Sequence, residues 1–270
     1  MLRRSISPAC AWLLPLLLAA CAVSAEPDGS EQGRIRLVSY NVKHGLGMDG
    51  ELDLERIARV LESLDPDIVL LQEIDVVCGR SGGVDQARAL GERLGMDSRF
   101  AAFMDFDGGQ YGLATLSRLE ILDSQVIVLP PGTREPRSAL IVTVQAGEAA
   151  ARVANAHLDW LKDDTERLAQ ARALRAELAT PGAPFVLAGD LNDTPESATL
   201  AVFTSGESPL RRLGPAEGTF PSDGPERTID HVLVGPAGSW EITEVRVVDE
   251  KVASDHCPIV VDLRLVGPGK

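Results

Sequence analysis

Short apolar runs recur along the chain from about residue 34 onward, and most have the length and β-branched content of strands. Three longer stretches, 52–64, 84–94 and 165–178, carry Leu or Ala at every third or fourth position among charged residues, which predicts amphipathic helices. Ten strands with three or four helices predict an α+β domain, in which helices flank a pair of mixed sheets, rather than a strictly alternating βαβ fold. The expected strands are 35–40, 68–72, 113–116, 121–129, 139–144, 152–156, 185–188, 229–234, 242–248 and 259–265.

The N-terminal segment has a different pattern from the rest of the chain. Arg3 and Arg4 precede an apolar stretch at 9–25, which Pro15 interrupts. This stretch is too short and too broken for a confident membrane span, whereas basic residues followed by a short apolar region are typical of an export signal. We therefore predict that residues 1–20 are an export signal of the lipoprotein type.

Small residues precede Cys21, and this arrangement resembles a bacterial lipobox. It predicts that Cys21 becomes a lipidated first residue that anchors the protein to a membrane of the bacterial envelope. A second small-residue site ends at Ala25, and cleavage there would instead release a periplasmic or secreted protein. Residues 21–33, which are polar from Glu26 onward, are expected to form a flexible tether, and 34–270 a single domain.

The charge balance changes the range of expected partners. The chain carries 26 Lys and Arg against 40 Asp and Glu, a formal net charge of −14, and only 4% of its residues are aromatic. This composition excludes a basic protein that coats nucleic acid and leaves little surface for base stacking, although a local basic groove stays open. Nucleic acid is therefore a disfavoured substrate, and no protein partner is predicted. Cys78 and Cys257 are the domain's only candidate disulfide pair, and their pairing stays open.

Polar side chains suited to metal or phosphate chemistry lie directly beside several predicted strands. Asn41 and Asn192, taken singly, suit turns. Glu73 suits a solvated strand end, and His157 suits a buried structural hydrogen bond. Six such places in chain order, each at a strand end, nevertheless favour one functional site. The set comprises Asn41, Glu73, His157, Asp190 with Asn192, Asp230, and Asp255 with His256.

An ordered series of short motifs accompanies these residues. In chain order the motifs resemble those of the endonuclease/exonuclease/phosphatase superfamily, and the resemblance covers residues 34–265. It implies a four-layer α/β/β/α sandwich of the DNase I-like type and a phosphoester hydrolase, here an exported bacterial member. The motifs are SYNV (39–42), LQE (71–73), YG (111–112), LSR (116–118), NAHL (155–158), GDLN (189–192), IDH (229–231) and SDHCP (254–258), of which LQE, GDLN and SDH are the most specific.

The resemblance also implies a metal site. Glu73 is expected to bind Mg²⁺, or Mn²⁺ in its place, with Asn41 and Asp255 close by or bonded through water. One or two carboxylates suffice because Mg²⁺ keeps most of its waters, whereas Zn²⁺ would require His or Cys ligands. Lys43 stands where the nuclease branch usually has another polar or acidic residue, which favours one metal ion over two.

The catalytic roles implied by the resemblance follow from what phosphoester hydrolysis requires. An attacking water must lose a proton, and negative charge on the phosphoryl and leaving oxygens must be stabilised. The resemblance implies that Asp190 is the general base and that Asn192 holds the water or a phosphoryl oxygen. His157 and His256 would donate hydrogen bonds to the developing charge, and Asp230 would orient His256.

Two arginines are candidate phosphate ligands. The guanidinium groups of Arg80 and Arg137 match phosphate geometry bidentately, but each residue alone equally suits an ordinary ion pair. The loops at 105–110 and 204–224 are expected to form the pocket walls and set specificity.

These observations favour a Mg²⁺-dependent phosphodiesterase that acts on a small-molecule or lipid-derived phosphoester in the cell envelope. One alternative is a secreted or periplasmic nuclease, and another is a non-catalytic interaction module. The module is disfavoured because buried charged groups without a role cost stability. A binuclear metallophosphatase would match GDLND at 189–193, but the chain has only 4 His, and they lie outside the motifs of that class.

Overall fold

The computed structural model describes residues 33–179, 184–214 and 217–266. The predicted export signal at 1–20, Cys21, and all of the predicted tether except Gly33 lie outside the described residues. These described residues belong to the compact unit Gln32–Lys270. No helix in the described part of this unit is long and apolar enough to cross a membrane.

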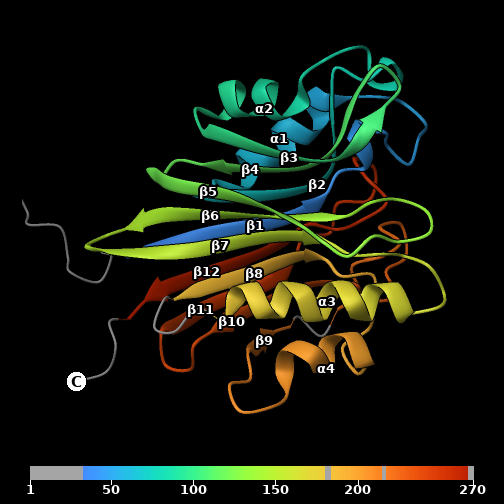
Figure 1. Ribbon diagram of the computed structural model, residues 1–270. Coiled ribbons are helices and arrows are strands. Elements are labelled where there is room, and N and C mark those ends of the chain that lie inside the picture. The colour runs from blue at the N-terminus through green and yellow to red at the C-terminus, as the bar shows by residue number, and fades with distance from the viewer. Residues whose placement is uncertain (1–32, 180–183, 215–216, 267–270) are drawn as a thin grey trace, which may run out of the picture. The chain divides into compact units, whose positions relative to one another are not determined.

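Two mixed six-stranded sheets form the centre of this unit (Figure 1). In each sheet one central pair of strands is parallel, β1 with β2 and β7 with β8, and the other pairs are antiparallel. The first sheet has the order β11 (Trp240–Val247), β12 (Ile259–Leu265), β1 (Arg34–Asn41), β2 (Ile68–Val76), β4 (Gly109–Ser117), β3 (Asp97–Phe106). The second has the order β5 (Ile121–Val128), β6 (Ser138–Ala146), β7 (Ala149–His157), β8 (Phe185–Asp190), β10 (Asp230–Gly235), β9 (Arg211–Leu213).

Four α-helices in the described residues cover the outer faces of the sheets. Helices α1 (Leu54–Leu64) and α2 (Gln86–Leu94) pack on the first sheet, and α3 (Thr165–Leu178) and α4 (Ala198–Thr204) pack on the second (Figure 1). Short 3₁₀ turns occupy Lys43–Gly45 and Gly79–Ser81. The predicted arrangement, with helices on both outer faces of two packed sheets, is confirmed.

Strand β1 shows why the sequence folds in layers. Ile35 and Leu37 point into the core between the sheets, whereas Val38 and Tyr40 point outward against α1. Side chains alternate between the faces of a strand, so a strand covered on both faces must be apolar at nearly every position. The continuous apolar runs in the sequence are therefore central strands, and helices bury their second face.

The sequence analysis missed three elements, β3, β9 and α4. Strand β3 lies at a sheet edge, and most of its side chains are only partly buried, so polar residues flank its short apolar run at 100–104 and the run contains no β-branched residue. Strand β9 and helix α4 are short, with 3 and 7 residues. The expected loop at 105–110 is wrong, because β3 and β4 pair through it and only Asp107 and Gly108 form the turn.

The two domain cysteines do not pair. Cys78 and Cys257 are both free and buried. The Cys78 thiol lies 3.2 Å from the carbonyl oxygen of Phe106, to which it donates a hydrogen bond. The question left open by the sequence is therefore settled for this structure.

A buried carboxylate ties β12 to β1, two adjacent inner strands of the first sheet. Asp262 accepts hydrogen bonds from Arg36 Nε at 2.8 Å and from Arg34 Nη2 at 2.9 Å. The hydrogen bond from Arg36 lowers the pKa of Asp262 although burial opposes this shift. A carboxyl with a lowered pKa stabilises the folded state above its unfolded pKa of about 4, and this contribution is lost as the pH falls through the folded pKa.

We expect Asp262→Asn to lower the free energy of unfolding by about 2 kcal/mol at neutral pH, since charge-assisted hydrogen bonds to a buried acceptor are lost. Urea unfolding of both proteins across the acid range measures this difference. It should begin to shrink below a pH of about 4, where the unfolded chain takes up the proton, and vanish below the lowered pKa of folded Asp262. A difference that stays constant with pH would contradict the charged interaction.

Candidate active site

The candidate residues meet at one end of both sheets. Asn41, His157 and Asp190 are the last residues of β1, β7 and β8. In the ladder, Asp190 is the register partner of His157 on one side and of Asp230, the first residue of β10, on the other. His256 lies just before β12. The ends of the central strands therefore bring together residues that are far apart in the sequence.

Glu73 reaches this place through an irregularity in β2. The strand does not end at Gln72, as expected, but continues to Val76 with a register shift between Gln72 and Ile74. Glu73 at this bulge has a φ of 61°, which is uncommon for a residue other than glycine. A bulge inserts one residue that is left out of the ladder and so can redirect its side chain. Here the side chain of Glu73 lines the pocket.

Hydrogen bonds between the sheets hold the two halves of the site together. Gln72 Nε2 donates to Asn155 Oδ1 at 2.8 Å. Asn155 Nδ2 donates across to the carbonyl oxygens of Leu71 at 3.0 Å and Ala114 at 2.9 Å. Asn155 lies two residues before His157, and Gln72 one residue before Glu73. The sequence placed both residues in motifs but did not reveal this structural role.

Gly189 allows β8 to approach β7 closely just before Asp190. A Cβ at this position would lie only 1.9 Å from the carbonyl oxygen of Ala156, and the φ of Gly189 is +146°. Both the space and the backbone conformation favour glycine. This close approach places Asp190 beside its register partner His157.

Asn41 lies between the two carboxylates at the centre of the site. Its Nδ2 donates to Glu73 Oε1 at 3.0 Å and to Asp190 Oδ2 at 3.1 Å. Its Oδ1 accepts a hydrogen bond from the backbone N–H of Lys43 at 3.1 Å. The buried side-chain amide of Asn41 therefore uses both its nitrogen and its oxygen in hydrogen bonds at the end of β1.

His256 pairs with two acids. Its Nδ1 lies 2.9 Å from Asp230 Oδ2, and its Nε2 lies 3.6 Å from Asp190 Oδ2. Burial alone would lower the pKa of His256, but the charges of Asp230 and Asp190 outweigh burial and raise it to about 10. His256 is therefore protonated at neutral pH, with Nδ1–H donating to Asp230.

His157 is held in the opposite protonation state. Its Nδ1 lies 3.5 Å from Arg137 Nη1, and its Nε2 lies 3.5 Å from Asp190 Oδ2. Burial first and the charge of Arg137 second lower the pKa of His157 well below its ordinary value. Because arginine can only donate, Nδ1 must accept and the proton resides on Nε2. The neutral ring therefore directs an N–H toward Asp190 and the pocket.

The carboxyl groups of Asp190 and Glu73 are buried, and burial disfavours their charged forms. Burial, together with the neighbouring charge of Asp230, raises the pKa of Asp190 to about 7. Burial also raises the pKa of Glu73, against the hydrogen bond from Asn41. Asp190 Oδ1 accepts the backbone N–H of Asn192 at 2.9 Å, while Asn192 Nδ2 donates to the carbonyl oxygen of Leu158 at 3.0 Å. Asn192 thus forms a turn, with a φ of 55°, and also lines the pocket.

The donor set fits a hard divalent cation. Asp190, Asp230 and His256 place one ligand-type atom each within 4.8 Å of one another, a group that can hold a metal ion only when His256 has lost its proton. Glu73 adds another carboxylate across Asn41, so the set is rich in oxygen, as Mg²⁺ and Mn²⁺ prefer. Burial raises the pKa values of Glu73 and Asp190, and a bound cation would favour the charged form of both carboxyls.

Asp255 has a cationic partner in the chain itself. Lys43 Nζ lies 2.8 Å from Asp255 Oδ2 at the edge of the site. Lys43 therefore places positive charge beside the carboxylate that was expected to lie near the metal. The expectation that Lys43 disfavours a second ion stays a prediction.

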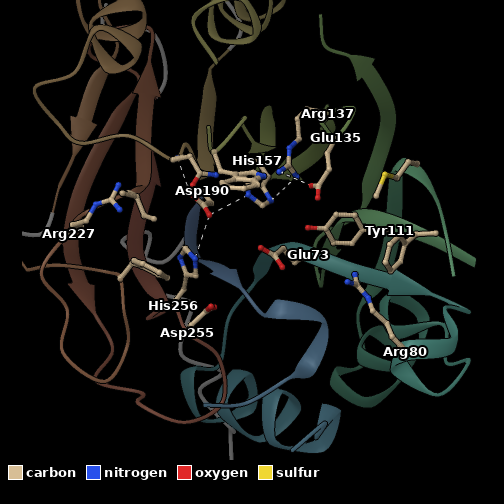
Figure 2. A pocket seen from close by; sticks show the side chains of 16 residues that line it. Glu73, Arg80, Tyr111, Glu135, Arg137, His157, Asp190, Arg227, Asp255 and His256 are labelled. Carbon is tan, nitrogen blue, oxygen red and sulfur yellow. Dashed lines mark hydrogen bonds and ion pairs between the residues drawn. The ribbon is translucent and has the colours of Figure 1, made fainter. Parts of the chain in front are cut away.

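A pocket of about 460 Å³ opens above these residues (Figure 2). Both predicted phosphate ligands, Arg80 and Arg137, line it. Arg137 is almost fully buried, lies 3.1 Å from Glu135 Oε2, and has no hydrogen-bond partner for Nε among the described residues. The remaining wall residues come from β3, β4 and several loops, and of these only Phe106 and Phe220 lie in the segments 105–110 and 204–224 that were expected to form the walls. These residues are Met104, Phe106, Tyr111, Glu135, Trp160, Phe220, Arg227 and Ile229.

Two facing mixed sheets with a buried Asp and His site at one end define a hydrolase of the DNase I-like fold. A model of the Endonuclease/Exonuclease/phosphatase family matches residues 38–256, and the chain belongs to this family. It is thus a phosphoesterase of that family with a buried Asp and His site.

Solved structures share the fold. An endonuclease/exonuclease/phosphatase from Beutenbergia cavernae DSM 12333 has 24% identity and a TM-score of 0.70, covering 87% of this chain and 72% of that chain. The mannosyl-6-phosphatase of Bacteroides thetaiotaomicron VPI-5482 has 19% identity and a TM-score of 0.70, over 85% and 99%. The human Nocturnin catalytic domain with bound sulfate anion has 20% identity and a TM-score of 0.70, over 87% and 96%.

Proposed function

We propose that this chain is a metal-dependent phosphodiesterase that hydrolyses a small-molecule or lipid-derived phosphoester. The observation that carries the proposal is the environment of Asp190. This carboxyl is buried at the base of the pocket, its pKa is raised to about 7, and two histidine Nε2 atoms lie within 3.6 Å of it. Phosphoester hydrolysis requires a base and donors of this kind in one place.

In the proposed mechanism Asp190 is the general base. A pKa near the working pH lets a carboxylate take a proton from water without being permanently protonated. The backbone N–H of Asn192 holds Oδ1, and Asn41 holds Oδ2, so the carboxylate is oriented before substrate arrives. The side-chain oxygen of Asn192 is the proposed acceptor for the attacking water.

The histidines and Arg137 supply positive charge and hydrogen-bond donors. His157, with its proton on Nε2, donates to a phosphoryl oxygen. Protonated His256, oriented by Asp230, donates to the oxygen on which negative charge develops. Arg137 lies beside His157 and presents an unpartnered Nε among the described residues, which suits a further phosphoryl oxygen.

The proposed metal ligands are Glu73, with Asn41 and Asp255 close by, and the proposed ion is Mg²⁺, with Mn²⁺ able to replace it. A divalent cation bound there supplies positive charge that neutralises the phosphoryl and leaving oxygens. The oxygen-rich donor set and the raised pKa of Glu73 support this choice.

The shape of the pocket supports a diester of modest size. Figure 2 shows Arg80 and Arg227 on opposite sides of Asp190, so the walls extend to both sides of the proposed reaction centre. A diester needs room for an organic group on each side of phosphorus. The net charge of −14 disfavours nucleic acid as the substrate. The envelope setting stays a prediction from the N-terminal sequence.

Two chromogenic esters test the reaction type. With Mg²⁺ present, we expect faster hydrolysis of bis-p-nitrophenyl phosphate than of p-nitrophenyl phosphate, because the diester fills both sides of the centre. EDTA should abolish hydrolysis, and Mg²⁺ or Mn²⁺ should restore it. Faster monoester cleavage would replace the diesterase proposal with a phosphatase. Recovery with stoichiometric Zn²⁺ alone would contradict the proposed ion, and cleavage of neither ester nor of any lipid headgroup diester would favour an interaction module.

A further inference from the structure

The guanidinium of Arg80 is fixed against a buried carboxylate at one wall of the pocket. Asp75 is completely buried, and its two oxygens accept from Arg80 Nε and Nη2, each at 2.8 Å. This bidentate pair uses one edge of the planar guanidinium. Arginine has five N–H groups, so its other edge stays available for a second acceptor.

Aromatic rings and the neighbouring hairpin complete the support. The Arg80 guanidinium carbon lies 4.4 Å from the centre of the Phe106 ring and 5.0 Å from that of Tyr111. Its backbone N–H donates to Asp107 Oδ2 at 2.6 Å, which ties the 3₁₀ turn to the β3–β4 hairpin. Asp75 therefore holds one edge of the guanidinium, the aromatic rings contact it, and Asp107 holds the backbone of Arg80. Because the side chain is already ordered, Arg80 loses little conformational entropy when a ligand binds.

The open edge of this guanidinium faces the pocket. Arg80 lines the pocket, its side chain is 30% exposed, and Nη1 makes no hydrogen bond to any described residue. In Figure 2 the guanidinium lies beyond Glu73 as seen from Asp190, next to the ring of Tyr111. Arg80 is thus placed away from the proposed reaction centre but within the same pocket.

Three acids of the pocket, Glu73, Glu135 and Asp255, bear on whether a second anion can bind beside Arg80, and the proposed metal ion neutralises Glu73. Glu135 is paired with Arg137, and Asp255 with Lys43, so both acids are matched within the chain. A guanidinium can hold one carboxylate on each edge, because its charge is delocalised over the plane. The aromatic surface of Phe106 and Tyr111 beside it excludes water from one face, which strengthens a charged hydrogen bond.

We propose that Arg80 binds a second anionic group of the substrate, a phosphate or a carboxylate, carried by the part of the molecule that is not hydrolysed. This inference rests on the proposed function, since the first anion is the phosphoryl group at Asp190. It makes Arg80 a specificity-determining residue and assigns the substrate class as phosphoesters with at least two anionic groups.

Isothermal titration calorimetry of the full chain in excess Mg²⁺ tests the inference without requiring turnover. The ligands are α,ω-alkanediyl bisphosphonates from ethylene to hexamethylene, and the alkyl monophosphonates of matching length. We expect one chain length at which the bisphosphonate binds about tenfold or more tightly than its monophosphonate, as a charged bidentate contact predicts. The ω-phosphonocarboxylates of the same length then distinguish a phosphate from a carboxylate as the preferred second anion.

Variants assign the preference to Arg80. Arg80→Lys keeps the positive charge but cannot bind Asp75 and a ligand anion on two edges of one planar group. The preference for the bisphosphonate should then fall to about twofold or less, which is the statistical factor for a ligand with two equivalent phosphonate groups. Asp75→Asn combined with Arg80→Gln removes both charges, leaves no buried carboxylate unpaired, and should have the same effect. Arg227→Gln, on the opposite wall of the same pocket, is the matched control and should keep the preference.

Three results would overturn the inference. The first is an equal affinity for bisphosphonates and monophosphonates at every length in a protein that hydrolyses phosphodiesters, which leaves the proposed function intact. The second is an equal loss of preference in Arg227→Gln, which removes the assignment to Arg80. The third is absence of binding by every phosphonate together with absence of phosphoester hydrolysis, which rejects the proposed function and this inference together.

Discussion

Replacing Asp190 with Asn should lower kcat by about 10³-fold or more, because the amide cannot accept the proton of the attacking water. The substitution keeps the shape of the side chain and its hydrogen bond from the backbone of Asn192. Steady-state hydrolysis of bis-p-nitrophenyl phosphate in Mg²⁺ measures the loss. Wild-type turnover in this variant would contradict the role of Asp190 as the base.

The same variant should melt at a higher temperature than the wild type when both are measured in EDTA. Burial raises the pKa of Asp190 to about 7. A carboxyl with a raised pKa destabilises the folded state increasingly as the pH rises from its unfolded pKa of about 4, and the neutral amide removes this cost. Greater stability together with lost turnover would distinguish a catalytic group from a structural one.

Asp193 provides a matched control in the same loop. Its Oδ2 lies 3.2 Å from Arg167 Nε, and its Oδ1 accepts the backbone N–H of Thr194 at 3.0 Å. Both oxygens are therefore engaged in the structure of the loop. Asp193→Asn should keep turnover within a few-fold, whereas a binuclear metallophosphatase, in which Asp193 would be a ligand, predicts a large loss.

Glu73→Gln should abolish the stabilisation by Mg²⁺ and lower kcat about as strongly as Asp190→Asn. Saturating Mg²⁺ stabilises a protein that binds it only when folded, by about 2.7 kcal/mol at a hundred times Kd. This corresponds to an increase in Tm of roughly 5 to 10 °C for a domain of this size. The amide keeps the volume of Glu73 but removes the charge that attracts the ion, so the increase should disappear. Thermal unfolding with and without Mg²⁺ measures it.

Two further variants decide which group holds the ion. Glu135→Gln changes another carboxylate of the same pocket, one that pairs with Arg137, and should keep the increase in Tm. Asp230→Asn changes a member of the Asp190, Asp230 and His256 group. A full Mg²⁺ effect in Glu73→Gln together with its loss in Asp230→Asn would move the metal to that group and contradict the assignment to Glu73.

Much of the fold was predictable because the central strands are buried on both faces. Such strands must be apolar at nearly every position, and their boundaries followed from this constraint, as β12 shows. The bounds of helix α3 followed instead from its amphipathic repeat. Edge strand β3 was missed for the opposite reason, since partial burial permits Asp97, Arg99 and Asp105 within it. The residue composition of a segment therefore indicates how deeply the segment is buried, but it does not show whether the segment pairs with a neighbouring strand.

The site shows the same division. Asn41, His157 and Asp190 were predicted together because each ends a central strand, and the structure brings them together. The bulge that turns Glu73 into the pocket has no apolar signature, because it depends on the backbone of a single residue. The support of Arg80 by Asp75 and Phe106 was also not predictable, since it joins a loop to a hairpin that the sequence analysis had taken for a loop.

The amide bridge from Gln72 to Asn155 has a consequence for how the protein would fail under stress. Glu73 and Asn41 belong to one sheet, while His157 and Asp190 belong to the other. Each sheet keeps its own ladder of hydrogen bonds, so a small separation of the sheets would leave the secondary structure nearly intact while it divides the reacting groups. Turnover therefore depends on the contact between the two sheets. Under denaturing conditions, activity would be lost before the β-strand content of the protein falls.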